Sequence, residues 1–578
     1  MDKVLRINVG ADGGPKAKTE GLGEYAGLGG RAMTSLVVCK EVPPLCHPLG
    51  PENKLVIAPG IMSGSAAPTS GRVSIGCKSP LTGTIKEANS GGSGAQALSR
   101  LGYAAVILEG ARKNSDLYRI VINSKEVRIE KCNDWRGLTN YDLNYRIRDE
   151  FGTKVSVFSI GTAGEMLMCN STIAVTDPEC RPSRHAGRGG VGAVMGSKGI
   201  KCIIIEYEDT KMREPKDATK FKDANKRFAE GLLKHGVTGQ GLPAYGTNVL
   251  VNILNEAGGL PTKNFSTGRF ADADKISGET MAATITKRGG NPTHGCHRGC
   301  IIKCSGIYVD KDGKYISKQP EYETVWAHGA NCGISDLDAI AEMDYWDDNY
   351  GLDTIEMGAT IAVAMDAGVI QFGDAKGALN LIHETGKGTH LGRILGAGTA
   401  VTAKCFGLER APVVKGQAMP AYDPRAVKGQ GVTYATTTMG ADHTAGYAVT
   451  ANILGVGGTV DPLKPAGQVE LSRNLQIATA ALDSTGWCLF IAFAILDQPE
   501  TFQAMVDSLN AMTGLSLTAD DVNELGKKIL RAEKDFNEKA GFGPQQDRLP
   551  MYFSREALAP HGVKFDVSDA DLDAVYKF

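Results

Sequence analysis

The hydrophobic pattern of this chain changes character near residue 208, and that change constrains the fold more than any other feature of the sequence. Before it, short apolar or alternating runs such as KVLRINV, YAAVILEG and VSVFSIG are separated by Gly, Asn and Asp turns. Such runs are typical of β-strands. After the charged stretch at 207–220, helical patterns dominate, and the segment after Thr518 places its apolar residues on one face.

We therefore predict an α+β fold with a β-rich N-terminal domain at residues 1–208, followed by two mainly α-helical domains at 209–415 and 416–578. The charged stretch is typical of a surface linker, and the second boundary is placed near the run ERAPVVKGQAMPAYDP. No solenoid-type repeat is visible. A chain of 578 residues has enough volume to enclose a cofactor.

Charge and hydropathy argue against several classes of function. The formal net charge is −2 and the sequence pI is about 6.6, so no overall charge favours nucleic acid or an anionic membrane. The apolar stretch at 487–496 is too short to span a bilayer. The N-terminal sequence lacks the charged-then-apolar pattern of an export signal. We expect a cytoplasmic protein without a nucleic-acid or membrane partner.

Three of the thirteen cysteines are clustered in HGCHRGCIIKCSG, where Cys296, Cys300 and Cys304 follow a C-x3-C-x3-C spacing. Without an export signal disulfides are disfavoured, so clustered cysteines are interpreted first as metal ligands. The glycines at 295 and 299 would let the backbone loop around an iron–sulfur cluster, which needs a fourth ligand from elsewhere.

Two alternatives to an iron–sulfur cluster remain open at this point. A zinc site could combine the thiolates with His294 or His297. The i, i+4, i+8 spacing also fits three small buried residues of a helix. The other cysteines, such as Cys39, Cys77, Cys202 and Cys405, occur singly in apolar runs and are expected to be inert core residues.

Two separated segments share the pattern Asp-x-x-Gly-apolar-(Asp or Cys), namely DNYGLD from Asp348 to Asp353 and DSTGWC from Asp483 to Cys488. A carboxylate can accept two hydrogen bonds from adjacent N–H groups of a 2-aminopyrimidinone ring. Two such segments suit two copies of one heterocycle, and Cys488 is a candidate fourth cluster ligand. The alternative is that each Asp caps a helix and each Gly forms a turn.

Three glycine-rich segments of the first domain are suited to anions. APTSGR presents Arg72, NSGGSG presents Asn89 and Gly91 before a helical stretch, and RPSRHAGRGGVGAVMGSKG presents Arg184 and Arg188. Backbone N–H groups at a helix start and guanidinium groups both bind phosphate oxygens. The sequence has no GxxxxGK[ST] P-loop, and the glycine runs lack the strand–turn–helix pattern and acidic residue of a dinucleotide-binding fold. Any one loop could be a plain turn, but three together favour a phosphate-bearing cofactor.

The segments SGR…KSPLTG, NSGG, IGTAGE, AGRGGVGAVMGSKG, GLPTKNFSTG, PEYETVW, YGLDTI and DSTGWC stand in the order found in the aldehyde:ferredoxin oxidoreductases. From about residue 5 to at least 495 the chain resembles the catalytic subunit of that family. The resemblance implies a tungsten (or molybdenum) bis-pterin cofactor, Mg²⁺ bridging the pterin phosphates, and a 4Fe–4S cluster. It also implies that the first domain forms a base for the pterin.

The resemblance also implies roles for individual positions. The cluster ligands would be Cys296, Cys300, Cys304 and Cys488, and the cofactor contacts would be Arg72, Asn89, Gly91, Arg184, Arg188, Asp348, Gly351, Leu352, Asp353 and Asp483. PEYETVW offers Glu321 and Glu323, of which the separation from Asp348 favours Glu323, and GADHT offers His443. The family's usual spacing for the first two cluster cysteines is C-x2-C, whereas this chain has C-x3-C.

The predicted reaction is oxidation of a small-molecule aldehyde to a carboxylate, with His443 polarising the carbonyl and Glu323 acting as general base. Electrons would leave through the cluster to ferredoxin or a dedicated iron–sulfur subunit. One alternative keeps the cofactor but reduces carboxylates or aryl thioesters. Another is a non-catalytic cluster protein or zinc scaffold. The sequence leaves the metal, the preferred substrate, the electron partner and any oligomer open.

Overall fold

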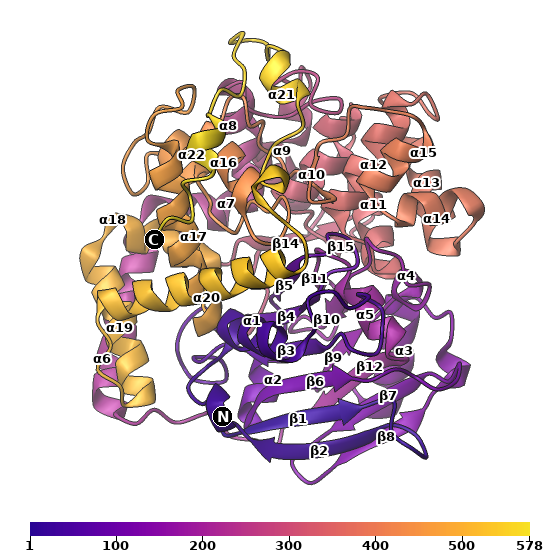
Figure 1. Cartoon of the computed structure of the whole chain (residues 1–578), viewed down its shortest axis with the longest axis vertical. Coiled ribbons are helices and arrows are strands. Elements are labelled where there is room, and N and C mark those ends of the chain that lie inside the picture. The colour runs from indigo at the N-terminus through magenta and orange to yellow at the C-terminus, as the bar shows by residue number, and fades with distance from the viewer.

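The computed structural model describes residues 1–578. Its N-terminal part contains two six-stranded sheets of the same topology (Figure 1). The first sheet runs β2 (Lys16–Gly21), β1 (Lys3–Asn8), β6 (Tyr103–Glu109), β3 (Leu55–Pro59), β4 (Val73–Lys78) and β5 (Ile85–Ser90). The second runs β8 (Val127–Lys131), β7 (Tyr118–Ile122), β12 (Ile200–Glu206), β9 (Val155–Ser159), β10 (Ile173–Val175) and β11 (Arg184–Ala186).

The two sheets form an internal repeat that the sequence analysis did not detect. In each sheet one pair of strands, β1 with β6 or β7 with β12, is parallel, and all other neighbours are antiparallel. The connecting helices also correspond. α1 (Gly30–Glu41) follows β2 as α3 (Asn140–Phe151) follows β8, and α2 (Gly94–Arg100) follows β5 as α5 (Val191–Ser197) follows β11. The repeat presents two equivalent sets of loops to the rest of the chain.

The remainder is mainly helical and lies over the paired sheets in Figure 1. The predicted α+β class is therefore confirmed, while the limits at 208 and 415 stay predictions. The helices that matter most here are α6 (Ala218–Lys234), α10 (Tyr322–His328), α11 (Leu337–Tyr350), α12 (Thr354–Asp366), α15 (Thr399–Cys405), α16 (Lys428–Thr436), α17 (Gln468–Thr485), α19 (Pro499–Thr513) and α20 (Ala519–Lys539). A small sheet of β13 (Asn291–His294), β14 (Ser305–Val309) and β15 (Tyr315–Lys318) lies among them.

Helix α20 joins the helical part to the first sheet. The amphipathic segment predicted after Thr518 forms this helix, and Thr518 and Asp521 form a capping box at its start. Arg31 of α1 donates to both carboxylate oxygens of Glu533, with Nε–Oε1 and Nη2–Oε2 distances of 3.0 and 2.8 Å, and all four atoms are buried. This pair fixes α20 across α1. None of the helices combines the length and the apolar character that a bilayer crossing requires.

Candidate active site

The two Asp-x-x-Gly motifs adopt the same local structure. Asp348 lies in the last turn of α11 and Asp483 in the last turn of α17, and each helix ends at a glycine in the left-handed conformation. These are Gly351 at φ 77° and Gly486 at φ 89°, a backbone region that glycine adopts at little cost. The turn interpretation was therefore correct for the glycines. The capping interpretation was wrong for both aspartates, whereas Asp353 does cap α12.

The end of α17 packs on the first half of the repeat. The amide of Arg72 donates to the carbonyl of Gly486 at 3.0 Å, and the amide of Cys488 donates to the carbonyl of Thr69 at 3.0 Å. A Cβ atom at Gly60 would collide with the backbone of Gly486, so glycine is required at this contact. The Arg72 segment and the Cys488 segment, distant in sequence, are thereby held side by side.

The end of α11 packs on the second half of the repeat in the equivalent way. The amide of Thr172 donates to the carbonyl of Gly351 at 2.8 Å, and that of Asp353 donates to the carbonyl of Asn170 at 2.9 Å. A Cβ atom at Gly161 would collide with the backbone of Tyr350. The two Asp motifs therefore contact equivalent loops, one in each half of the repeat.

The side chains beside these contacts also correspond. Arg72 Nε donates to Asn89 Oδ1 at 2.6 Å in the first half, and Thr172 Oγ1 lies 2.7 Å from His185 Nδ1 in the second. The arginine and asparagine occur only on the side that carries Cys488. The repeat therefore offers two similar binding positions, one of which is adapted to the cysteines.

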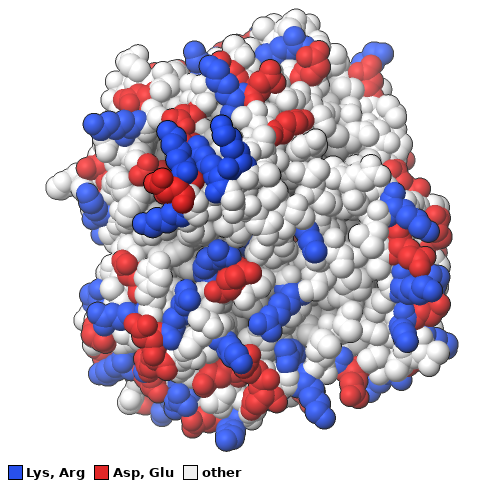
Figure 2. All heavy atoms as spheres, turned by 180° about the vertical axis from the view of Figure 1, so that it is seen from behind, with Lys and Arg blue, Asp and Glu red and all other residues white.

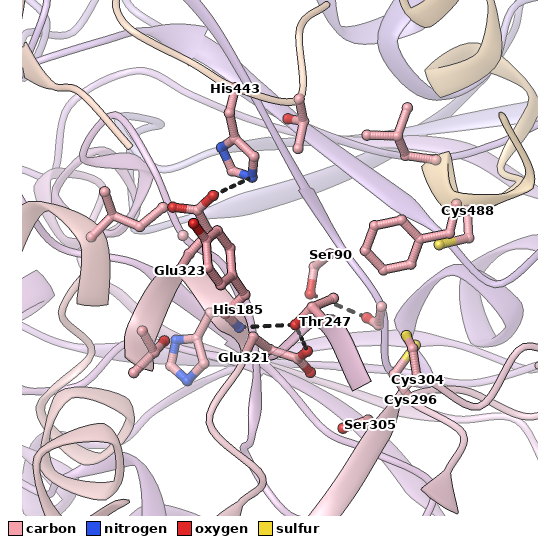
Figure 3. Close-up of a pocket in the computed structure, with 18 of the residues that line it drawn as sticks. Ser90, His185, Thr247, Cys296, Cys304, Ser305, Glu321, Glu323, His443 and Cys488 are labelled. Carbon is pink, nitrogen blue, oxygen red and sulfur yellow. Dashed lines mark hydrogen bonds and ion pairs between the residues drawn. The ribbon is translucent and has the colours of Figure 1, made fainter. Parts of the chain in front are cut away.

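A cavity of about 350 Å³ lies among these elements. Figure 3 shows Glu323 and His443 on one side of it and three cysteines on the other. The predicted site residues that line it are Arg72, Gly91, Arg184, Arg188, Cys296, Cys304, Glu323, Asp348, Leu352, Asp353, His443 and Cys488. The fold thus brings together most of the residues that the sequence analysis selected from separate parts of the chain.

Four predicted residues lie beside the cavity rather than on its surface. Asn89 is bonded to Arg72, Cys300 lies next to Cys296, and Gly351 is buried against the Gly161 backbone. Asp483 Oδ2 lies 3.7 Å from Arg31 Nη1, and 14% of its side chain remains accessible. Burial and the nearby Glu87 carboxylate raise the pKa of Asp483.

The cysteine trio lies in a loop between β13 and β14, so the helical alternative for these residues is wrong. Gly299 has φ 86°, which allows the chain to reverse within the motif. The ligand atoms of Cys296, His297 and Cys300 lie within 4.8 Å of one another. Cys304 and Cys488 reach the same end of the cavity as Cys296 (Figure 3). This donor set fits a thiolate-bound cluster with a remote fourth ligand.

Arg72 lies near the cysteines and near Asp483, and the charges of both affect its guanidinium. A Cβ atom at Gly91 would approach both Arg72 Nη1 and Cys296 Sγ to 3.1 Å, so these two groups flank the glycine closely. Burial lowers the pKa of the guanidinium, but the Cys488 and Cys296 thiols and the Asp483 carboxylate outweigh it and raise the pKa above its ordinary value. Arg72 can therefore balance negative charge on both sides.

Lys318 and His185 contact Asp348, and the sequence analysis missed both residues. Lys318 Nζ lies 2.7 Å from Asp348 Oδ2 and 2.8 Å from Asp344 Oδ1, and His185 Nε2 lies 3.2 Å from Asp348 Oδ1. Burial raises the pKa of Asp348 to about 6, against the opposing effect of Lys318. His185 stands between the two selected arginines, a signal that could have been used. Lys318 is the last residue of β15, and no sequence motif marked it as a site residue.

Glu323 and His443 form a close pair, with Oε1 and Nε2 3.4 Å apart. Glu323 Oε2 accepts from the amide of Ala421 at 3.0 Å, while Glu323 Oε1 and His443 Nδ1 have no hydrogen-bond partner. Burial raises the pKa of Glu323, and His443 opposes this. Glu321 also lines the cavity but accepts from Thr247 at 2.8 Å. Each glutamate accepts one hydrogen bond, and the contact with His443 favours Glu323 over Glu321.

The two selected arginines have different surroundings. Arg184 Nη2 donates to Ser305 Oγ at 2.9 Å, and its buried Nε has no partner. Arg188 donates to Asp353 at 3.1 Å and to the carbonyls of Ala418 and Ala441 at 2.8 Å. The guanidinium of Arg188 is thus already largely occupied by protein acceptors, and its contact with a phosphate stays a prediction.

The cavity wall leaves buried polar atoms without partners, which is uncommon in folded proteins. They include Arg184 Nε, Glu323 Oε1 and His443 Nδ1. A Cβ atom at Gly187, which lines the cavity, would meet nothing within 4 Å. Donors and acceptors facing an open internal space fit a polar cofactor that carries both kinds of group.

The single cysteines are mostly buried, as expected. Cys77 and Cys202 are fully buried in the sheets and Cys39 is partly buried. The expectation was wrong for Cys405, which is exposed at the end of α15. It therefore provides a surface thiol remote from the clustered motif in sequence.

Comparisons with known proteins agree with this architecture. Residues 4–207 match the aldehyde ferredoxin oxidoreductase N-terminal domain, and residues 223–578 match domains 2 and 3 of that family. Proteins named tungsten-containing aldehyde ferredoxin oxidoreductase from Pyrococcus horikoshii and Thermococcus kodakarensis are 38% and 36% identical, each alignment covering 97% of this chain and 92% of the relative.

Two more distant proteins are also similar to this chain, one in sequence and one in fold. An aliphatic sulfonate oxidoreductase, WOR-like subunit, from Pyrococcus furiosus is 25% identical over 88% of this chain and 81% of its own. The structure of the active site complex BamBC of benzoyl coenzyme A reductase superposes with a TM-score of 0.81 at 17% identity, covering 100% of this chain and 94% of that chain. On the family match and the close relatives, this chain belongs to the aldehyde ferredoxin oxidoreductase family of oxidoreductases.

Proposed function

We propose that this chain oxidises aldehydes to carboxylic acids at a bis-pterin tungsten (or molybdenum) centre and passes the electrons to a 4Fe–4S cluster. The observation that carries the proposal is the cavity itself. On one side it holds a carboxylate and an imidazole, each with one atom that forms no hydrogen bond. On the other side it holds cysteines of the clustered motif together with Cys488, which is distant in sequence. The names of the relatives with 36–38% identity support tungsten as the metal and an aldehyde as the substrate.

The repeat supports an assignment of the cofactor positions. Asp348 and Asp483 would each hold one pterin, since their helix ends meet equivalent loops. Asn89 and Gly91 would contact magnesium and phosphate, and Cys296, Cys300, Cys304 and Cys488 would hold the cluster. When bound, the metal centre supplies the two-electron redox chemistry.

The protein side chains would manage the substrate oxygen and its protons. A protonated nitrogen of His443 would donate to the aldehyde oxygen as negative charge develops there. Glu323 Oε1 forms no hydrogen bond and lies 3.4 Å from His443 Nε2. It would accept a proton from water or from the hydrated aldehyde. Burial raises the pKa of Glu323 towards neutral pH, which makes the carboxylate a stronger base.

An aromatic wall leads away from this pair and indicates the class of aldehyde. Tyr422 lies 6.0 Å from His443 and 5.6 Å from Tyr447 between ring centroids, Tyr447 lies 6.3 Å from Phe493, and Phe493 stacks on Phe490 at 6.0 Å. All five rings line the cavity. The cationic lining residues are Arg72, Arg184, Arg188 and Lys318, and each has an anionic neighbour.

An aldehyde with an uncharged, apolar or aromatic substituent would therefore be preferred over one carrying phosphate or carboxylate. Ring stacking on the wall stabilises such a substrate. Arg184, Arg188 and Lys318 already face carboxylates, which leaves little positive charge on the wall to balance an anionic group.

The cluster loop offers an exit for electrons to an acidic acceptor such as ferredoxin. Arg298 and Lys303 lie between the cluster cysteines, are exposed and form no ion pair within the chain. No acidic residue occurs between Glu279 and Asp310. Elsewhere charges are mixed, and Figure 2 shows both signs interspersed over one face. The local positive charge of Arg298 and Lys303, and not the net charge of the protein, would then select the acceptor.

Metal analysis and a substrate series would test this function. The isolated protein should hold about one tungsten or molybdenum and about four irons per chain. With a viologen dye it should oxidise benzaldehyde and unbranched aliphatic aldehydes faster than glyceraldehyde 3-phosphate. Zinc alone, or turnover of thioesters, carboxylates or sulfonates without aldehyde oxidation, would contradict the proposal.

A further inference from the structure

His297 lies directly against a cysteine of the proposed cluster. Its Nδ1 is 3.2 Å from Cys296 Sγ, and only 2% of the residue is exposed. Its other ring nitrogen, Nε2, is buried without a hydrogen-bond partner. An imidazole withdrawn from water in this way needs a structural or chemical reason, because burying an unpaired polar group is unfavourable.

The surrounding backbone holds the imidazole in place. A Cβ atom at Gly71 would collide with the His297 ring, so the ring packs directly against the segment that carries Arg72. The amide of Gly92 donates to the carbonyl of Cys296 at 3.1 Å, and the amide of Cys300 donates to the carbonyl of His297 at 3.2 Å. These contacts orient Nδ1 towards Cys296 Sγ.

The position in the sequence is also unusual. His297 stands three residues before Cys300, where the C-x2-C spacing typical of the family would place its first cysteine. Two assignments are therefore possible. Either Cys296 binds iron and the imidazole assists it, or the imidazole replaces the thiolate, as histidine does in Rieske centres.

We infer that His297 is a positioning residue whose Nδ1–H donates a hydrogen bond to the cluster-bound sulfur of Cys296 and raises the reduction potential of the cluster. Four cysteines already provide one ligand for each iron, so no iron remains for the imidazole. A donor to a ligand sulfur stabilises the reduced cluster, which carries more negative charge. The inference rests on the cluster of the proposed function.

Two substitutions at this position separate the hydrogen bond from packing. His297→Leu fills the space but has no donor, whereas the side-chain amide of His297→Asn can place an N–H near the position of Nδ1. In redox titrations of the holoenzyme followed by electron paramagnetic resonance, the Leu variant should retain about four irons and show a more negative midpoint potential. The Asn variant should recover most of the wild-type value.

A matched control is available on the same loop. His294 pairs with Glu179 at 3.1 Å rather than with a cysteine, so His294→Leu should leave the potential unchanged. An unchanged potential in His297→Leu would overturn the inference while leaving the cluster intact. If the wild-type cluster shows the hyperfine coupling of an iron-bound nitrogen, or if His297→Leu yields a three-iron cluster, the imidazole is a ligand and the inference is wrong. Wild-type protein without iron would instead refute the cluster itself.

Discussion

Glu323 Oε1 lies 3.4 Å from His443 Nε2, a pairing that joins α10 to the loop after α16 at the wall of the cavity. Neither Glu323 Oε1 nor His443 Nδ1 takes part in a hydrogen bond within the protein. The pair can therefore act on a substrate without first breaking a hydrogen bond at those atoms.

Removing either member of this pair should slow the reaction without emptying the site. We expect Glu323→Gln and His443→Ala to lower kcat by about 10²- to 10⁴-fold, the usual contribution of a general acid or base. Tungsten (or molybdenum) and iron contents should stay at wild-type values. A variant with full metal content and full aldehyde turnover would eliminate the assigned role.

The pH profile should report the carboxylate of Glu323. A general base works when deprotonated, so kcat/KM should rise with pH through the pKa of Glu323 and level off above it. Burial raises that pKa, which places the acid limb above the ordinary glutamate value of about 4.3. Because His443 opposes the rise, His443→Gln should move the limb to still higher pH. A limb at or below the ordinary value would contradict this account.

The remote cysteine should be as important to the cluster as the trio. Cys488→Ala removes one thiolate, so iron content should fall below about four per chain and the cluster signal should change or disappear. Cys405→Ala is the matched control, since that thiol is exposed at the end of α15. Full iron and an unchanged spectrum in Cys488→Ala would mean that the fourth ligand lies elsewhere.

Charge reversal on the cluster loop should affect the protein acceptor alone. We expect Arg298→Glu with Lys303→Glu to raise KM for ferredoxin at least about tenfold at low salt, because a local attraction becomes a repulsion. Viologen reduction should be unchanged, since the small dye needs no docking surface. Lys287→Glu, on a neighbouring exposed helix end, serves as the control. An equal loss with both acceptors would place the defect in the site and not in docking.

The buried Arg31–Glu533 pair should dominate the attachment of α20. Glu533→Gln removes the carboxylate that accepts two hydrogen bonds from the buried guanidinium of Arg31, and breaking a buried pair costs about 3–5 kcal/mol. The melting temperature in calorimetry should fall accordingly. Glu524→Gln, at the exposed Lys527 pair on the same helix, should melt as the wild type does. Equal melting of both variants would show that the buried pair does not secure the helix.

Local chemistry was enough to predict much of this protein. Gly299 allows the cysteine trio to form a loop, Gly351 and Gly486 end helices in the left-handed conformation, and the Thr518 segment forms the predicted helix. These outcomes depend on residues a few positions apart, so the sequence by itself determined them, together with the β-rich then helical order of the chain.

Only the tertiary structure decided which distant groups meet. The internal repeat puts Thr172 and His185 at the positions equivalent to Arg72 and Asn89, although the two halves share no obvious motif there. Lys318 pairs with Asp348, and Asp483 stays beside the cavity rather than on its wall. Such contacts arise from the close packing of backbones contributed by separate sheets and helices. Their distances follow from the whole fold, and no short stretch of sequence encodes them.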